Sequence, residues 1–304
     1  MKQTAILAVV VWLLAVDVLA GEPQLVLSLE PVEVSQGGIL QIKAWGKDIA
    51  AARAIFSDRD LLLVRGRDDV FSAFWGVDLE ERPRVLDFAV EIRTSSEEKW
   101  AKRLTAYVKA KEFPTETISV PPASDTFDSA TLKRIEKEQA VLERLWKIHS
   151  ANRLWEGVFA APVPGGISSQ FGFRRVINGL ARAPHTGVDL RAALGAEVMA
   201  ANSGRVVLKD DFFFGGKSLV LDHGGGLYTM YFHLSEFRAE KNAQVRKGEM
   251  IGLAGMTGRV TGPHLHWGAR LNGARIDPME LLALQEGERR EATGERQEKE
   301  SKMH

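Results

Sequence analysis

The chain of 304 residues is long enough for two domains, and 45% hydrophobic and 26% charged residues are ordinary proportions for a globular protein. Its formal net charge is zero, so no overall field favours binding to nucleic acid. The sequence has no Cys, which excludes disulfides and a cysteine-linked lipid anchor.

Residues 1–20 have the pattern of a secretory signal peptide. Lys2 precedes an apolar run from Ala5 to Ala15, and Val18-Leu-Ala20 gives small residues before the expected cleavage point. The run is shorter than the roughly 20 apolar residues of a spanning helix, which favours cleavage over a membrane anchor. We therefore expect an exported protein without stable membrane insertion. The periplasm is the favoured location, with an extracellular or cell-wall-associated location as the alternative.

Residues 21–113 predict an accessory β-sandwich, described as immunoglobulin-like from its pattern alone. Short apolar or alternating runs recur at roughly ten-residue spacing, separated by turn signals. The five predicted strands cover residues 25–29, 40–45, 61–64, 85–92 and 104–108. No catalytic constellation is found here, and the Asp and Arg residues are expected to form a solvated face.

Residues 114–150 predict a linker followed by an amphipathic helix. The linker, Pro114 to Asp128, contains Pro121-Pro122 and several Ser and Thr. Asp128 or Ser129 can cap a helix that runs to about His149, which is expected to lie outside any site. The apolar face is predicted to contain Leu132, Ile135, Leu142, Leu145 and Trp146. A docking strut is the favoured interpretation, and a plug that keeps the active site latent is the alternative.

Residues 151–284 predict a second β domain with consecutive antiparallel hairpins. The hairpin strands include residues 206–208, 218–221 and 227–232, which are separated by glycine-rich turns. Residues 285–304 are highly charged and almost without apolar groups, so we expect a disordered tail whose His304 has no role in a site.

Four of the seven histidines occur in three short motifs, Pro184-His-Thr-Gly-Val-Asp189, Tyr231-Phe-His-Leu-Ser235 and Pro263-His-Leu-His-Trp267. Residues two apart on a strand share a face, so His264 and His266 are expected to face one groove. His185 and Asp189 also share a face if extended, with Gly187 allowing a kink. Imidazoles and one carboxylate form a ligand set that zinc prefers where a position stays open for water. Spacing alone does not choose between His264 and His266 as the ligand.

Beyond these motifs, residues 155–283 resemble the catalytic domain of the lysostaphin-type (LytM-like) zinc metallopeptidases, which are peptidoglycan endopeptidases. The segments that match the family also include residues 169–175, 195–200, 221–229, 245–252 and 258–267. The resemblance implies an antiparallel β-sheet peptidase domain with one zinc ion per chain. It assigns His185, Asp189 and His266 to the metal, and His233 and His264 to catalysis. His223 matches a position that is not catalytic, and we interpret it as a structural turn residue.

The function that the resemblance implies is that of an exported zinc metalloendopeptidase. It would hydrolyse peptide crosslinks of bacterial peptidoglycan, using zinc-activated water and two catalytic histidines. Its partners would be peptidoglycan stem peptides or crosslinks, not nucleic acid, and a regulatory protein partner stays unidentified. The alternative is a non-catalytic peptidoglycan-binding regulator that activates another cell-wall hydrolase. The presence of all three ligands and both histidines favours the enzyme.

One stretch departs from the family pattern. Some lysostaphin-like members have a tyrosine before the first zinc histidine that helps to stabilise the transition state, but residues 176–182 contain none. Asn178 and Arg182 are the donors available there. The sequence leaves open which crosslink bond is cleaved and how His233 and His264 divide their roles.

Overall fold

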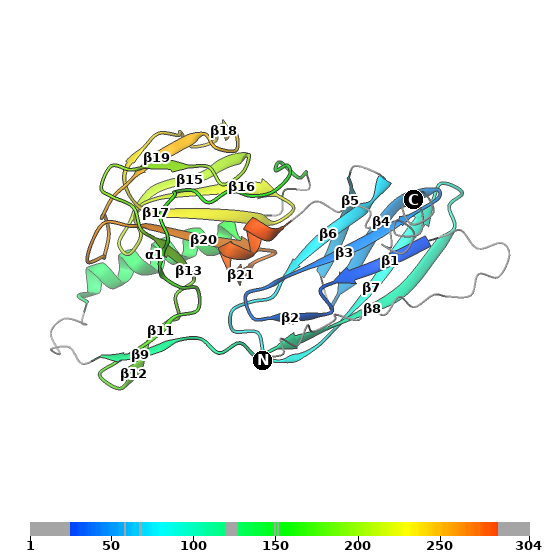
Figure 1. The fold of residues 1–304 in the computed structure, drawn as a ribbon, viewed down its shortest axis with the longest axis horizontal. Coiled ribbons are helices and arrows are strands. Elements are labelled where there is room, and N and C mark those ends of the chain that lie inside the picture. Colours follow the sequence, from blue (N-terminus) through cyan, green and yellow to red (C-terminus); the bar gives the residue numbers. More distant parts are fainter. Residues whose placement is uncertain are drawn as a thin grey trace, which may run out of the picture.

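The computed structural model describes residues 25–57, 59–66, 69–118, 127–148, 150 and 152–284. This part of the chain is mainly β, as the sequence predicted, and its two large sheets lie side by side (Figure 1). The predicted signal peptide, the charged tail with His304, and His149 lie outside the described residues. Within the described residues, no helix has the length and apolar character needed to cross a membrane.

The N-terminal sheet has eight strands in the order β1-β3-β6-β5-β4-β7-β8-β2. Side chains of β3 and β7, which are not neighbours in the sheet, pack in one apolar cluster with Leu40, Ile42, Leu86 and Phe88. The sheet therefore closes over a common core. The strands are β1 Leu25–Glu30, β2 Glu33–Ser35, β3 Ile39–Gly46, β4 Ile49–Phe56, β5 Arg59–Arg65, β6 Phe71–Gly76, β7 Arg84–Thr94 and β8 Lys99–Lys109.

All five predicted runs fall in strands, but β2, β4 and β6 were not predicted. Strand β4 contains four alanines, a residue type depleted in strands. Strand β6 is buried along its whole length, so it lacks the alternation that identifies a half-exposed strand. Both strands are specified by their neighbours in the sheet more than by their own sequence.

The C-terminal sheet has ten strands, and its longest path follows the order β10-β13-β20-β17-β16-β15-β18. Strands β15, β16 and β17 form the predicted consecutive hairpins. The strands are β10 Ile167–Ser169, β13 Gly187–Leu190, β14 Glu197–Met199, β15 Gly204–Phe212, β16 Gly216–Gly224, β17 Leu227–Phe237, β18 Gln244–Val245, β19 Met250–Ala254, β20 Leu265–Leu271 and β21 Ala274–Ile276. A 3₁₀ helix follows at Pro278–Ala283.

A small third sheet joins the predicted linker to the C-terminal half. Strand β9 (Thr115–Ile118) pairs in parallel with β11 (Arg174–Ile177), which forms a hairpin with β12 (Leu180–Ala181). The linker prediction is therefore wrong for residues 115–118, because the edge of this hairpin supplies hydrogen-bonding partners for the chain. Residues 119–126 lie outside the described residues.

Helix α1 (Ser129–Leu145) packs against the C-terminal sheet. The Asp128 side chain accepts a hydrogen bond from the Thr131 amide and caps the helix as predicted. Leu145 joins Leu208, Phe212 and other sheet residues in an apolar cluster, which supports the docking-strut interpretation.

Two details of the helix prediction are wrong. Leu132 is 47% exposed, so it does not belong to the packing face. The helix also ends at Leu145 instead of near residue 149. Beyond it, the Ile148 carbonyl accepts a hydrogen bond from the Tyr228 hydroxyl, which directs the chain onto the sheet.

The two large sheets share a packed interface. Ile39, Phe74 and Leu79 of the N-terminal half belong to the same buried cluster as the core of the C-terminal sheet. At its edge, Asp78 pairs with Arg275 at 2.5 Å. The expectation that N-terminal Asp and Arg residues form a solvated face is therefore wrong for Asp78, which the opposite half partly covers.

Candidate metal and catalytic site

The first pair of site residues comes from neighbouring strands. Asp189 on β13 lies directly opposite His266 on β20, so their side chains project from the same face of the sheet. His266 Nδ1 lies 2.9 Å from Asp189 Oδ1. Strand pairing thus brings together two residues that are 77 positions apart in sequence.

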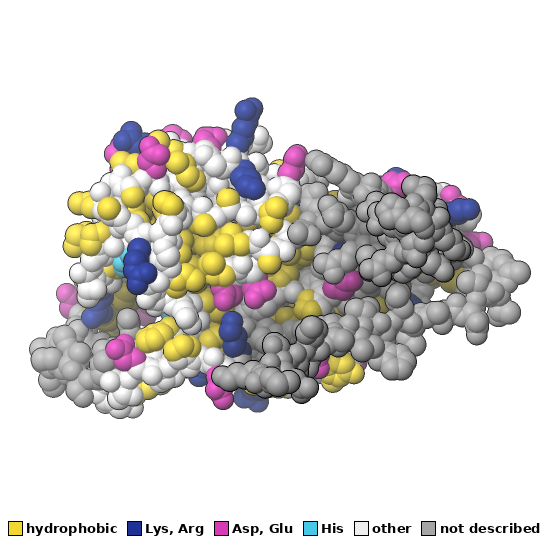
Figure 2. Space-filling view, in the orientation of Figure 1, with side chains coloured by type: hydrophobic (Ala, Val, Ile, Leu, Met, Phe, Trp, Pro, Cys, Tyr) yellow, Lys and Arg dark blue, Asp and Glu magenta, His cyan; other side chains and the backbone are white. Residues whose placement is uncertain are grey.

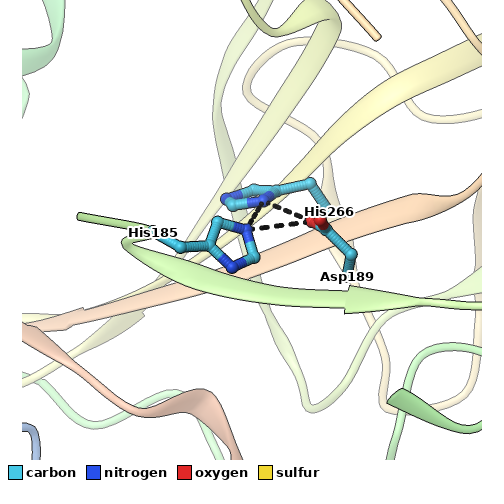
Figure 3. A group of neighbouring side chains, drawn as sticks. All are labelled: His185, Asp189 and His266. Carbon is cyan, nitrogen blue, oxygen red and sulfur yellow. Dashed lines mark hydrogen bonds and ion pairs between the residues drawn. The ribbon is translucent and has the colours of Figure 1, made fainter. Parts of the chain in front are cut away.

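His185 completes this group from the segment that precedes β13. Its Nε2 lies 3.0 Å from Asp189 Oδ1 and 3.0 Å from His266 Nδ1 (Figure 3). Its other nitrogen, Nδ1, donates to the Gln170 carbonyl at 2.9 Å. A carbonyl can only accept, so this bond leaves the lone pair on Nε2 and turns that nitrogen toward the group.

The three side chains fit a zinc ion. One ligand atom from each lies within 4.8 Å of the other two. Zinc binds histidine nitrogen at about 2.0–2.1 Å, so the ligand atoms of a tetrahedral site are about 3.3 Å apart. The spacing of 2.9–3.0 Å is close to that value. Two imidazoles and one carboxylate also leave a fourth coordination position for another ligand.

Gly187 allows this packing because it has no side chain. A Cβ there would lie 2.8 Å from His266 Nε2 and 2.5 Å from the Trp267 carbonyl oxygen. Gly187 lies within β13 and is not among the residues with positive φ. Its role is to make room for the His266 ring, which differs from the kink expected from the sequence.

His264 reaches the site from just before β20. The strand begins at Leu265, and His264 forms an isolated bridge with Gly255. Its Nδ1 donates to the Gly262 carbonyl at 2.9 Å, and its Nε2 lies 3.7 Å from Asp189 Oδ1. His264 and His266 therefore meet at one carboxylate, although only His266 belongs to the regular strand.

His233 reaches the site through an irregular backbone. His233 follows Phe232 on β17. In a regular strand its side chain would therefore point away from the face of the sheet that carries Phe232 and His266. Its φ of 64° and the register shift beside Leu234 change that direction. The His233 ring centre lies 4.9 Å from that of His264 and 6.0 Å from that of His266.

Two residues that support the site were missed by the sequence analysis. The Phe232 ring stacks on His266 with centroids 5.5 Å apart. The Thr257 carbonyl accepts a hydrogen bond from His233 Nδ1 at 3.0 Å, and its hydroxyl bridges the Lys217 amide and the Leu234 carbonyl. Phe232 directly precedes His233 in its motif, and this position could have indicated a residue near the site. No sequence feature indicates Thr257.

Burial and hydrogen bonding set the electrostatics of the site. Burial alone would raise the pKa of Asp189, but the close contacts of its carboxylate with the His185 and His266 imidazoles outweigh burial and hold that pKa well below its ordinary value. Burial lowers the pKa of His266, and burial followed by the nearby His266 lowers the pKa of His233 to about 4. These shifts favour an ionised Asp189 carboxylate beside a neutral His266 imidazole, which are the protonation states that metal ligation requires of these two residues.

An open cavity of about 500 Å³ lies beside these residues. It is lined by Ser168, Asp189, Arg191, Ala192, Ala193, Thr261, Gly262, Pro263 and His264. On the face shown in Figure 2, histidine appears as a small exposed patch with a Lys or Arg side chain directly beside it. The site is thus open to a substrate from one side.

His223 lies outside this group and has a structural role, but it lies within β16 and not in the turn expected from the sequence. It is fully buried, with Nδ1 bonded to the Ser203 carbonyl and Nε2 to the Thr229 hydroxyl, both at 2.7 Å. Asn178, a suggested donor, has a φ of 51° in the turn between β11 and β12. Asn is one of the residues that adopt this left-handed conformation readily, so formation of the turn accounts for Asn178 without a catalytic role.

Comparisons with known proteins agree with this geometry. The family described as peptidase family M23 matches residues 183–278. The chain is 40% identical over 115 residues to a Neisseria meningitidis protein named DD-carboxypeptidase/endopeptidase Mpg, and 40% identical over 114 residues to the Vibrio cholerae peptidoglycan DD-endopeptidase ShyA. These matches cover 38% and 37% of this chain, and 26% of each relative. The chain thus spans about a quarter of the length of these curated relatives.

A crystal structure extends the similarity beyond the histidine motifs. It comes from Pseudomonas aeruginosa, is described as a candidate peptidase M23, and is 30% identical with a TM-score of 0.64. The alignment covers 82% of this chain and 94% of that one. Residues 114–304 make up less than two thirds of the chain, so the alignment must include strands of the N-terminal sheet.

Proposed function

We propose that this chain, which belongs to peptidase family M23, is an exported zinc endopeptidase that hydrolyses peptide crosslinks of bacterial peptidoglycan. The observation that carries the proposal is the meeting of His185, Asp189 and His266 beside two further imidazoles, at an open cavity. The name of the Vibrio relative, a peptidoglycan DD-endopeptidase, supports peptidoglycan as the substrate class. The signal-like pattern of residues 1–20 supports export.

In this proposal His185 Nε2, His266 Nδ1 and an Asp189 oxygen hold one zinc ion. When bound, zinc supplies Lewis acidity and lowers the pKa of a coordinated water. The Gln170 carbonyl fixes the tautomer of His185, and the Phe232 ring fixes the plane of His266. The protein thus holds its ligand atoms before the metal arrives, which favours binding.

His264 and His233 are proposed as the groups that move protons. Each uses its Nδ1–H on a backbone carbonyl, of Gly262 and of Thr257 respectively, so each keeps Nε2 as the acceptor. Either imidazole can take a proton from the attacking water and then, as an imidazolium, donate it to the leaving amine. An imidazolium can also donate to the developing oxyanion.

The first test of the proposal is metal content. Purified protein is expected to hold one zinc ion per chain by elemental analysis, and His185→Ala, Asp189→Ala and His266→Ala are each expected to lose most of it. His264→Ala is expected to keep its zinc. A wild-type protein that binds no stoichiometric zinc would show the ligand assignment to be wrong.

The second test is digestion of purified sacculi with mass spectrometry of the products, which also identifies the bond cut. Zinc-loaded His264→Ala is expected to be slower than wild type by about 10²- to 10⁴-fold, the usual contribution of general acid–base catalysis. His149→Ala, which the sequence places outside the site, is the matched control. Unchanged muropeptides with the wild-type protein, together with normal cellular behaviour of His264→Ala, would instead favour a non-catalytic regulator.

A further inference from the structure

The cavity beside the site has a cationic wall formed by Arg191. This residue comes two positions after Asp189, immediately after β13, and lines the same cavity as Asp189 and His264. Residues two apart in an extended chain project to the same side, with Cα atoms about 6.6–6.8 Å apart. Arg191 and the proposed ligand Asp189 therefore line one cavity from nearby positions of the same segment.

The backbone of Arg191 is held by a glycine pair. Its amide donates to the Gly166 carbonyl at 2.9 Å, and a Cβ on Gly165 would overlap the Arg191 carbonyl at 1.7 Å. A Cβ on Gly166 would lie 3.7 Å from Arg191 Nη1, so the guanidinium rests against a residue without a side chain. The segment that carries Arg191 is thus fixed, while the end of its side chain stays accessible.

The Arg191 guanidinium is available for a ligand. Within the described ranges it makes no hydrogen bond and no ion pair with another side chain, and the residue is exposed. Two other arginines close to site residues in the sequence are engaged by aromatic rings, Arg174 over Phe113 and Arg259 over Phe127. Asp189 is the only acidic residue among those lining the cavity, and it is already bonded to two imidazoles.

We propose that Arg191 binds the carboxylate that the substrate carries on the carbon next to the scissile nitrogen. The inference rests on the proposed function. Consider an amide whose carbonyl side and nitrogen side are each attached to a carbon of D configuration. The carbon attached to the leaving nitrogen then also carries a carboxylate, whether the leaving group is a D-amino acid or the side chain of a diamino acid. That carboxylate lies two bonds from the scissile nitrogen, so it enters the site together with the reacting amide.

The neighbouring groups suit this ligand. A guanidinium binds a carboxylate with two parallel hydrogen bonds, which gives it direction as well as charge. Ser168 and Thr261 add hydroxyl groups to the same cavity. Arg191 then acts as a specificity residue that places the scissile amide next to the proposed metal ligands, without taking part in proton transfer.

The test compares two crosslinked peptide dimers that differ at one group. One carries a carboxylate on the carbon next to the scissile nitrogen, and the other carries a carboxamide. Wild type is expected to prefer the carboxylate dimer by about 10- to 100-fold in kcat/KM, the range of a hydrogen bond to a charged group. Arg191→Ala is expected to lose this preference, because its kcat/KM should fall much further on the carboxylate dimer than on the carboxamide dimer, and Arg191→Lys is expected to recover part of the preference.

Binding gives a readout independent of catalysis. Zinc-loaded His264→Ala should bind the carboxylate dimer at least 10-fold more tightly than the carboxamide dimer in calorimetry, and the double variant with Arg191→Ala should bind both equally. Arg238→Ala is the matched control, since Arg238 is an exposed arginine that directly follows a strand of the same sheet, β17, and does not line the cavity.

Two results would overturn the inference: equal binding of both dimers to the His264→Ala protein, or an Arg191→Ala effect of the same size on both dimers. A wild-type protein that cleaves neither dimer, yet binds the carboxylate dimer through Arg191, would instead reject the proposed function and keep the subsite.

Discussion

At the scale of single residues, burial and partners separate histidines that look alike in the sequence. His223 is fully buried and satisfied by Ser203 and Thr229, whereas His264 keeps one nitrogen directed toward the Asp189 carboxylate. Burial also lowers the pKa of His223 to about 4, the largest contribution to its shift. This residue therefore links the stability of the fold to pH.

The sign of that link follows from proton uptake. The folded state keeps His223 neutral down to about pH 4, whereas the unfolded state protonates it below about pH 6.5. Stability from this residue is complete above about pH 6.5 and falls as the pH drops toward 4, by on the order of 3 kcal/mol in total.

His223→Gln cannot take up a proton. We expect it to be less stable than wild type by about 1–3 kcal/mol at neutral pH, because its hydrogen bonds are lost, and the difference should shrink toward pH 4. Urea unfolding of both proteins at several pH values measures this. A difference that stays constant with pH would contradict the assignment.

At the scale of elements, the site depends on an irregularity in β17. His233 is directed to the site by a left-handed backbone at a register shift. Gly255 lies so close to this point that a Cβ there would be 2.4 Å from the Ser235 amide nitrogen and 2.7 Å from the His233 carbonyl oxygen. Thr257 holds the irregular segment, because its hydroxyl accepts from the Lys217 amide at 2.9 Å and donates to the Leu234 carbonyl at 2.8 Å.

Thr257→Val keeps the shape of the side chain and removes the hydroxyl, leaving one amide and one carbonyl without that partner. We expect a stability loss of about 1–3 kcal/mol and slower digestion of sacculi, with zinc content unchanged, because His233 loses its support and the ligands do not. Thr257→Ser retains the hydroxyl and is expected to restore activity. Zinc loss in Thr257→Val would indicate general disruption instead of a positioning role.

At the scale of the whole molecule, the two sheets behave as one packed body. The buried cluster that contains Phe74 and Leu79 also contains the core of the C-terminal sheet. Asp78 accepts hydrogen bonds from the Arg275 amide and guanidinium, with 26% and 20% of the two side chains exposed. Burial opposes ionisation of Asp78, but the bonds from Arg275 lower its pKa overall.

Asp78→Asn is therefore expected to destabilise the full chain by about 2 kcal/mol, because it leaves the partly buried Arg275 without its charged partner. The control is Glu80→Gln, since Glu80 contacts the same guanidinium but is 56% exposed and should contribute less than about 1 kcal/mol. Urea unfolding of the two variants measures the difference. Equal losses would show that the interface does not depend on this pair.

The sequence by itself determined the features that depend on local chemistry. Alternating runs predicted five N-terminal strands, and the residue types of the three histidine motifs identified all five residues that the fold gathers at the site. Tertiary structure decided what depends on distant partners: strands β4 and β6, the pairing of β9 with β11, and the support from Thr257. It also decided the register that places Asp189 opposite His266, because pairing across strands is fixed by packing of the whole sheet and not by either strand alone.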